Sequence, residues 1–174
     1  MNLVELQNKI HKQNKSVGWW DVVRPFSTFA CLFHSELSEA MEGDRKNLMD
    51  DHLPEYEMFW VEVADFAIRC MDWLGSKNHD DYNHCLNINH PTRLHFLNMM
   101  HIQVSSCAGL MIDPYYKNHS DPIDKIASAV ECCIAYAGEH GVDLKKIILE
   151  KVEYNLTRDD HKRENRAKSD GKKY

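Results

Sequence analysis

The chain has 174 residues, 43% hydrophobic and 28% charged, with a formal net charge of −6 at pH 7. This length suits one domain with its own core, and the composition excludes a disordered chain. The negative charge disfavours a nucleic-acid partner. The sequence contains no run of 18 apolar residues, so no membrane span is predicted. Because the chain also lacks a signal pattern, we expect a cytoplasmic protein. Five of the six cysteines lie in apolar helical runs, which favours buried free thiols.

Helical periodicity and helix-end signals predict an all-α fold with six main helices. The first is expected over roughly residues 2–14. Ser27 is a candidate N-cap for a second helix that ends near Gly43. Pro54 is expected to open a third helix that runs to Gly75.

The second half of the chain continues this pattern after a polar connection. Pro91 precedes a fourth helix, which the Asp-Pro pair at 113–114 is expected to stop. The Asp-Pro pair at 121–122 places a cap and a proline at the start of a fifth helix. Asp143 is expected to cap a sixth helix that continues to about Arg158. The resulting organisation is one domain over 1–158 and a charged tail over 159–174.

Two pairs of segments resemble each other at nearly equal offsets. HSELSE at 34–39 resembles HIQVSS at 101–106 at an offset of 67, and 64–75 resembles 130–141 at an offset of 66. A degenerate repeat of one helix pair explains this, and so does the general likeness of two helix pairs of similar length. In a true repeat, the second copy has lost three of four acids: Gln103, Ser106 and Ser128 replace Glu36, Glu39 and Glu62, and only Glu131 stays acidic.

Four carboxylates occupy unusual positions on the second and third helices. At 100° per residue, Glu36 falls within the apolar stripe of its helix, and Glu39 lies at the edge of that stripe. On the next helix, Glu62 lies on the shoulder of the apolar stripe, and Asp65 continues the same side. Helices that pack by these stripes would bring the four acids together.

Several anions in a partly buried space repel one another and lose hydration, at a cost of several kcal/mol, roughly, per ion. A hard divalent cation removes this conflict, and oxygen-only ligands favour Mg²⁺ or Mn²⁺ over zinc. The alternative is an ordinary solvated helix face, on which acids three residues apart are common.

The sixth helix supplies basic and amide groups. Lys151, Asn155 and Arg158 are spaced i, i+4 and i+7, so they project from one face within about 60° of arc. Such a face suits phosphate groups. A solvated helix end is the alternative, because basic residues also favour the C-terminal end of a helix dipole.

These motifs resemble those of the all-α nucleoside triphosphate pyrophosphatases of the MazG-like superfamily, which includes dimeric dUTPases and dCTP pyrophosphatases. The signature of that superfamily is ExxE, a gap, and then ExxD. Here ExxE is 36–39, the gap has 22 residues, and ExxD is 62–65. The late KVEYNLTR stretch matches the basic and amide helix of the superfamily. Residues 80–140 exceed the minimal family domain and look like the duplicated arrangement of dimeric dUTPases.

The resemblance implies a MazG-like bundle with a four-helix core and additional helices, assembled as a homodimer or homotetramer. It implies hydrolysis of a nucleoside triphosphate between the α and β phosphorus, giving monophosphate and pyrophosphate, as nucleotide-pool house-cleaning. Mg²⁺, or Mn²⁺ in its place, would be held by Glu36, Glu39, Glu62 and Asp65. Glu36 or Glu39 would orient or deprotonate the attacking water.

The resemblance also implies contacts to substrate. Lys151, Asn155 and Arg158 would hold phosphates, with the tail folding over them, and Lys46 (with Arg45) and Arg69 are further phosphate candidates. Arg69 could equally pin a carboxylate. Trp20, with Trp19 and His34 as weaker candidates, would contact the base, unless the two tryptophans only plug the bundle end. Standard dNTPs, modified dNTPs and dUTP stay open as substrates, with a small preference for pyrimidines.

Three other interpretations compete. A ferritin-like di-iron protein needs ExxH motifs, and neither acidic helix contains one. A zinc site formed by His79, His84, Cys85 and His90 is conceivable, although their irregular spacing favours a solvated loop. The non-enzyme alternative is a catalytically silent helical interaction module that retains the superfamily fold.

Overall fold

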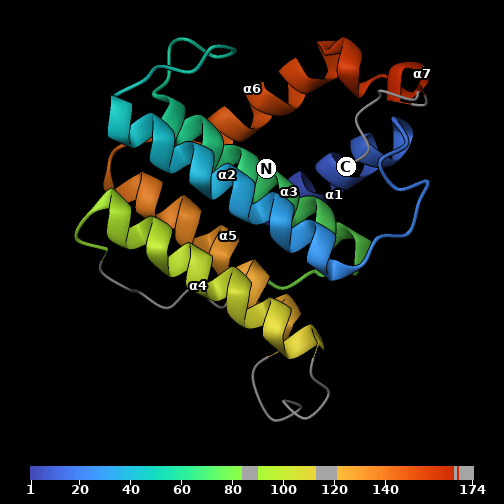
Figure 1. Cartoon of the computed structure of the whole chain (residues 1–174), viewed down its shortest axis with the longest axis horizontal. Coiled ribbons are helices and arrows are strands. Elements are labelled where there is room, and N and C mark those ends of the chain that lie inside the picture. Colours follow the sequence, from blue (N-terminus) through green and yellow to red (C-terminus); the bar gives the residue numbers. More distant parts are fainter. Residues whose placement is uncertain (84–89, 113–120, 167, 169–174) are drawn as a thin grey trace.

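The computed structural model describes residues 1–83, 90–112, 121–166 and 168, and within these ranges the chain is all-helical (Figure 1). The prediction of an all-α fold is therefore confirmed. The helices are α1 (Leu3–Ser16), α2 (Phe26–Lys46), α3 (Met58–Ser76), α4 (Arg93–Ile112), α5 (Pro122–Glu139), α6 (Leu144–Thr157) and α7 (Arg163–Arg166), with the 3-10 helix η2 (Asp159–His161) before α7.

Helix α3 is the centre of the bundle. It packs against α1, α2, α5 and α6, and 14 of its 19 residues are buried. Helices α4 and α5 lie side by side beneath α2 and α3 in Figure 1, and α6 crosses above them. Because α3 has neighbours on nearly every side, polar residues on its flank are buried together with the apolar ones. This burial places the carboxylate of Glu62 inside the protein.

The starts of α5 and α6 agree with the caps predicted for them. Asp121 accepts a hydrogen bond from the Ile123 amide with Pro122 behind it, and Asp143 accepts one from the Lys146 amide, so both predicted starts are confirmed.

The predicted limits of α2 and the predicted start of α3 are wrong. The N-cap of α2 is Pro25 rather than Ser27, and the helix continues through Gly43 to Lys46, where the C-cap Asn47, with a left-handed φ of 52°, ends it. Pro54 does not begin α3, because a loop after Asn47, with an isolated bridge between Met49 and Glu57, precedes the helix.

The burial patterns of the two helix pairs agree with the proposed offsets. Each buried residue of α5 lies 66 positions after a buried residue of α3, and four buried residues of α4 lie 67 positions after buried residues of α2. These four are Leu97, Met100, Val104 and Cys107, which follow Ala30, Phe33, Leu37 and Ala40. His34 and His101, which are equivalent at this offset, also contact each other, with their Nδ1 atoms 2.8 Å apart. The two pairs thus use equivalent faces.

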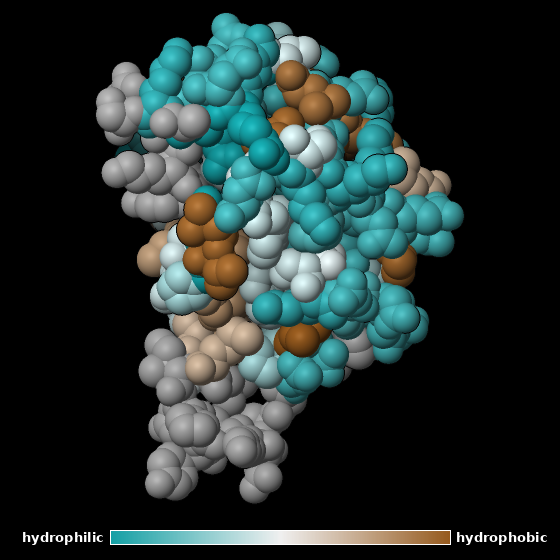
Figure 2. Space-filling model, turned by 90° about the vertical axis from the view of Figure 1, so that its right-hand side faces the viewer, coloured by the Kyte–Doolittle hydropathy of each residue, from teal (hydrophilic) through white to brown (hydrophobic). Residues whose placement is uncertain are grey.

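The face shown in Figure 2 is largely hydrophilic, and its apolar residues form small separate patches. None of the described helices combines the length and hydropathy that a bilayer crossing requires. Cys70, Cys107, Cys132 and Cys133 are buried, as predicted, whereas Cys31 is exposed.

Candidate functional site

Three carboxylates converge where α2 crosses α3. One oxygen from each of Glu36, Glu62 and Asp65 lies within 4.8 Å of the other two. Glu36 and Glu62 are only 4% and 6% exposed, because each side chain projects from a face that its helix packs against the bundle. We call these three residues the acid cluster.

The electrostatics of the acid cluster are unfavourable to three negative charges. Burial raises the pKa of Glu62 to about 9, and the charges of Asp65, Glu36 and Glu39 contribute to this increase. Burial also raises the pKa of Asp65, opposed by the nearby ammonium of Lys151. Near neutral pH, Glu62 therefore carries a proton unless a cation compensates its charge.

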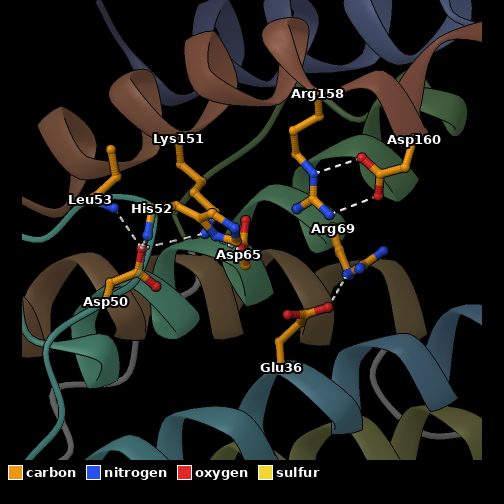
Figure 3. Close-up of polar contacts among 9 residues, drawn as sticks. All are labelled: Glu36, Asp50, His52, Leu53, Asp65, Arg69, Lys151, Arg158 and Asp160. Atoms are coloured by element: carbon orange, nitrogen blue, oxygen red, sulfur yellow. Dashed lines mark hydrogen bonds and ion pairs between the residues drawn. The ribbon is translucent and has the colours of Figure 1, made fainter.

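Two basic side chains already pair with the acid cluster (Figure 3). The Arg69 Nε donates to Glu36 Oε1, and the Lys151 Nζ lies 3.2 Å from Asp65 Oδ2. Lys151 is only 2% exposed, which differs from the open phosphate-binding face predicted for it. Arg69 fulfils the second of its two predicted roles, because it pins a carboxylate.

The acid cluster fits a hard divalent cation. Oxygen ligands on opposite sides of Mg²⁺ are about 4.2 Å apart, given Mg–O distances of about 2.1 Å. Oxygens separated by no more than 4.8 Å approach that arrangement with small side-chain rotations. Among the described residues, this is the one group of three or more His, Cys, Asp or Glu side chains close enough to hold an ion.

Glu39, the fourth predicted ligand, is not part of this cluster. It lies one turn beyond Glu36 on α2 and is exposed. Its charge still contributes to the raised pKa of Glu62, so it is close enough to act on the same space. The structure thus brings together three of the four predicted carboxylates and leaves the fourth in solvent nearby.

A cleft beside the acid cluster is lined by one of its residues, Asp65, and by aromatic and amide groups. Asp65 and Arg69 line it, as do Asn155 and Arg158 from the far end of α6. Trp19, Trp20 and Phe29 line the same cleft. The Asn155 Oδ1 is buried and has no hydrogen-bond partner among the described residues, so it can accept a hydrogen bond from a ligand.

The orientation of Trp20 is fixed by its neighbours. Its indole lies parallel to Phe29, with ring centroids 5.4 Å apart, and its Nε1 donates to Asp72 Oδ1 at 2.8 Å. Asp72 also accepts from Asn14 at 2.7 Å and contacts the His11 imidazole at 2.8 Å. Trp20 is therefore held against α1 and α3 as a rigid wall of the cleft.

The segment after α6 covers Trp19. The Arg166 guanidinium lies 3.5 Å from the centroid of the Trp19 ring, and His161 contacts the same indole edge-on. Arg158 is held by a two-point ion pair with Asp160, at 2.9 and 2.7 Å. The part of the tail that the structure describes thus lies against Trp19, which forms the aromatic wall of the cleft together with Trp20 and Phe29.

Two predicted contacts lie elsewhere. His34 stacks on His101 of α4, and its Nε2 is 3.4 Å from the hydroxyl of Ser105, so it does not line the cleft. Burial lowers the pKa of both imidazoles, which suits a neutral pair joined by one shared proton. Lys46 pairs with Glu42 on the exposed end of α2, as Arg45 does.

Two residues near the acid cluster and cleft were missed. Asp50 is buried in the α2–α3 loop, with its Oδ1 4.0 Å from the Lys151 Nζ, and no helical spacing marked it. Asp72 lies seven residues after Asp65 and three after Arg69, so helical spacing places all three on the same face of α3, which lines the cleft. This spacing could have identified Asp72 from the sequence.

The zinc alternative receives no support from the described part of the chain. His84 and Cys85 lie outside the described residues, and His90 faces His95, with 3.3 Å between their Nδ1 atoms.

Comparison with protein-family models, with curated proteins and with solved structures finds no match for this chain. Any function must therefore be argued from the residues of the cleft.

Proposed function

We propose that the chain is a Mg²⁺-dependent nucleoside triphosphate pyrophosphohydrolase of the MazG-like kind, cleaving between the α and β phosphorus. The observation that carries the proposal is the shared cleft, in which Asp65 of the acid cluster, the cationic and amide residues Arg158 and Asn155, and Trp20 line one continuous space. A nucleotide presents phosphates and a flat base, and the cleft offers a cationic group for the former and an aromatic surface for the latter.

The chain's own residues supply most of the required functions. Arg158, which lines the cleft, would neutralise phosphate oxygens, and the aromatic wall would stack on the base, while the buried Lys151 stays paired with Asp65. The exposed carboxylate of Glu39 is free to orient or deprotonate a water, which a buried and paired Glu36 does less well. When bound to the acid cluster, Mg²⁺ would supply charge neutralisation and lower the pKa of a water.

The raised pKa of Glu62 favours a cation-binding role over a purely structural one. Near neutral pH this carboxyl is ionised in the unfolded chain but protonated in the fold, so its burial lowers the free energy of unfolding and is better explained by a function. Mn²⁺ should substitute for Mg²⁺, since both prefer oxygen ligands. Homodimer or homotetramer assembly and a cytoplasmic house-cleaning role belong to the same proposal.

The competing function is a catalytically silent interaction module. The internal pairs of Arg69 with Glu36 and of Lys151 with Asp65 favour it, because they compensate two acids without a metal. Pyrophosphate release from a panel of standard, modified and uracil nucleotides, with Mg²⁺ and with EDTA, decides between them. We expect Mg²⁺-dependent release with at least one nucleotide, whereas silence with the whole panel would favour the module.

A further inference from the structure

Lys151 lies between two carboxylates that belong to different parts of the structure. Its Nζ is 3.2 Å from Asp65 Oδ2 on α3 and 4.0 Å from Asp50 Oδ1 in the α2–α3 loop (Figure 3). Only Asp65 belongs to the acid cluster. The ammonium is buried, so it cannot move into solvent without the side chain leaving its site.

Asp50 is held rigidly by its own loop. Its Oδ1 accepts hydrogen bonds from the amides of His52 and Leu53 at 2.9 and 2.8 Å, and its own amide donates to the Tyr56 carbonyl at 3.0 Å. Asp50 is 5% exposed and thus presents a fixed negative charge to Lys151. The buried Lys151 side chain is therefore an ammonium with one carboxylate on each side, Asp65 at 3.2 Å and Asp50 at 4.0 Å.

A cation at the acid cluster competes with this ammonium for Asp65. Both are positive and both need the same carboxylate, so the ammonium opposes cation binding unless another anion holds it. We propose that Asp50 is a positioning residue that acts through Lys151: it holds the ammonium when a divalent cation takes Asp65, and so reduces the competition between them. This inference rests on the proposed cation site and assigns Asp50 a role beyond closing its loop.

The substitution Asp50→Asn separates the two roles. The amide oxygen of asparagine can still accept from the His52 and Leu53 amides, so the loop keeps its hydrogen bonds, while the negative charge facing Lys151 is lost. Asp50→Ser is a second variant, with a short oxygen acceptor and no charge. Lys151→Met removes the competitor and keeps much of the volume.

The test measures Mn²⁺ affinity, without nucleotide, by electron paramagnetic resonance on the full chain. The proteins are wild type, Asp50→Asn, Lys151→Met, the double variant and Glu62→Gln. We expect Asp50→Asn to weaken Mn²⁺ binding about three- to tenfold, a coupling typical of contacting charges, and to change it less than about twofold in the Lys151→Met background. Asp50→Ser should behave in the same way if Asp50→Asn fails to fold.

Three results would overturn the inference. An equal loss with and without Lys151 would mean that Asp50 acts on the cation directly, and unchanged affinity in Asp50→Asn would mean that it only closes the loop. In both cases wild type still binds Mn²⁺ more tightly than Glu62→Gln, so the proposed cation site stands. Wild type that binds no more tightly than Glu62→Gln would remove the cation site and the role of Asp50 together.

Discussion

The Glu62 carboxyl is 6% exposed and lies beside two other acids, an arrangement that stability alone would not favour. Its pKa of about 9 in the folded protein lies above the ordinary value of 4.5. The stability that the protonated form contributes is therefore complete below about pH 4.5 and is lost as the pH rises to about 9.

Glu62→Gln keeps the shape of the side chain and removes its ionisation. We expect the metal-free melting temperature of wild type to fall more steeply between pH 6 and 9 than that of Glu62→Gln, with the variant at least as stable at pH 8. Thermal unfolding in EDTA across this range measures both proteins. Parallel curves would show that Glu62 ionises in the fold without cost.

Substitutions of Trp20 test whether the aromatic wall binds the base of the nucleotide. Removing a stacking surface worth about 1–3 kcal/mol should raise the KM of Trp20→Ala for its nucleotide by about tenfold or more, with a smaller change in kcat. Trp20→Phe keeps a ring against Phe29 but loses the donor to Asp72, so it should lie between wild type and alanine. Unchanged KM in Trp20→Ala would leave the tryptophan with only a packing role.

At the scale of helices, the approach of α2 to α3 sets the distance between Glu36 and Glu62. Gly43 lies in this contact, because an added Cβ would stand 2.9 Å from the Met58 Cβ and 3.0 Å from the Phe59 amide nitrogen. No flexible side-chain end is available there to move aside. A methyl group at this position would push the two helices apart.

We expect Gly43→Ala to reduce the free energy of unfolding by about 1–3 kcal/mol and to weaken Mg²⁺ binding. The matched control is Gly138→Ala in α5, where an added Cβ meets nothing within 4 Å and helix propensity should add up to about 1 kcal/mol. Urea titrations of both variants measure these changes. A Gly43→Ala protein as stable as wild type would show that this contact has room to spare.

Helix ends show what the sequence can predict. Asp121 and Asp143 are capping side chains next to clear helical runs, so the starts of α5 and α6 were predicted correctly. Ser27 and Pro54 carry the same residue-type signals, yet Pro25 caps α2 and a loop precedes α3. Several residues near a helix end can carry a capping or proline signal, and the packing of the helix decides where it begins.

The candidate site was predictable where it depends on helix faces. Glu36, Glu62 and Asp65 converge because they lie on or beside the apolar faces of their helices, and these faces pack together. The 3.6-residue spacing of apolar residues in the sequence identifies such faces. The pairing of Lys151 with Asp50 depends on how a loop folds, and the direction of His34 depends on where α4 packs. The spacing of residues along the helices predicts neither of these contacts.

Across the whole molecule, the two helix pairs share burial patterns but have different polar residues. Gln103 of α4 stands 67 positions after Glu36 and donates to the Lys125 carbonyl at 2.7 Å. Its neighbour Ser106 donates to the Gln103 carbonyl at 2.8 Å. These groups in the second pair are engaged in the hydrogen bonds of the bundle, so the acid cluster belongs to the first pair.

We therefore expect Gln103→Glu to destabilise the folded protein. A carboxylate cannot donate to the Lys125 carbonyl, and we expect the free energy of unfolding to fall by about 1–3 kcal/mol without a gain in Mg²⁺ binding. Glu36→Gln is the matched exchange in the first pair and should instead weaken Mg²⁺ binding. A Gln103→Glu protein that binds an additional Mg²⁺ would reveal a second site and contradict this division.

If the acid cluster holds a divalent cation, titration of the metal-free protein with Mg²⁺ in a calorimeter should detect its binding. In wild type near pH 7 we expect binding with release of protons, because Glu62 must ionise, seen as a heat that depends on the ionisation enthalpy of the buffer. Glu36→Gln, Glu62→Gln and Asp65→Asn should each lose most of this binding. Binding of equal affinity in wild type and all three variants, or none in wild type, would contradict the account.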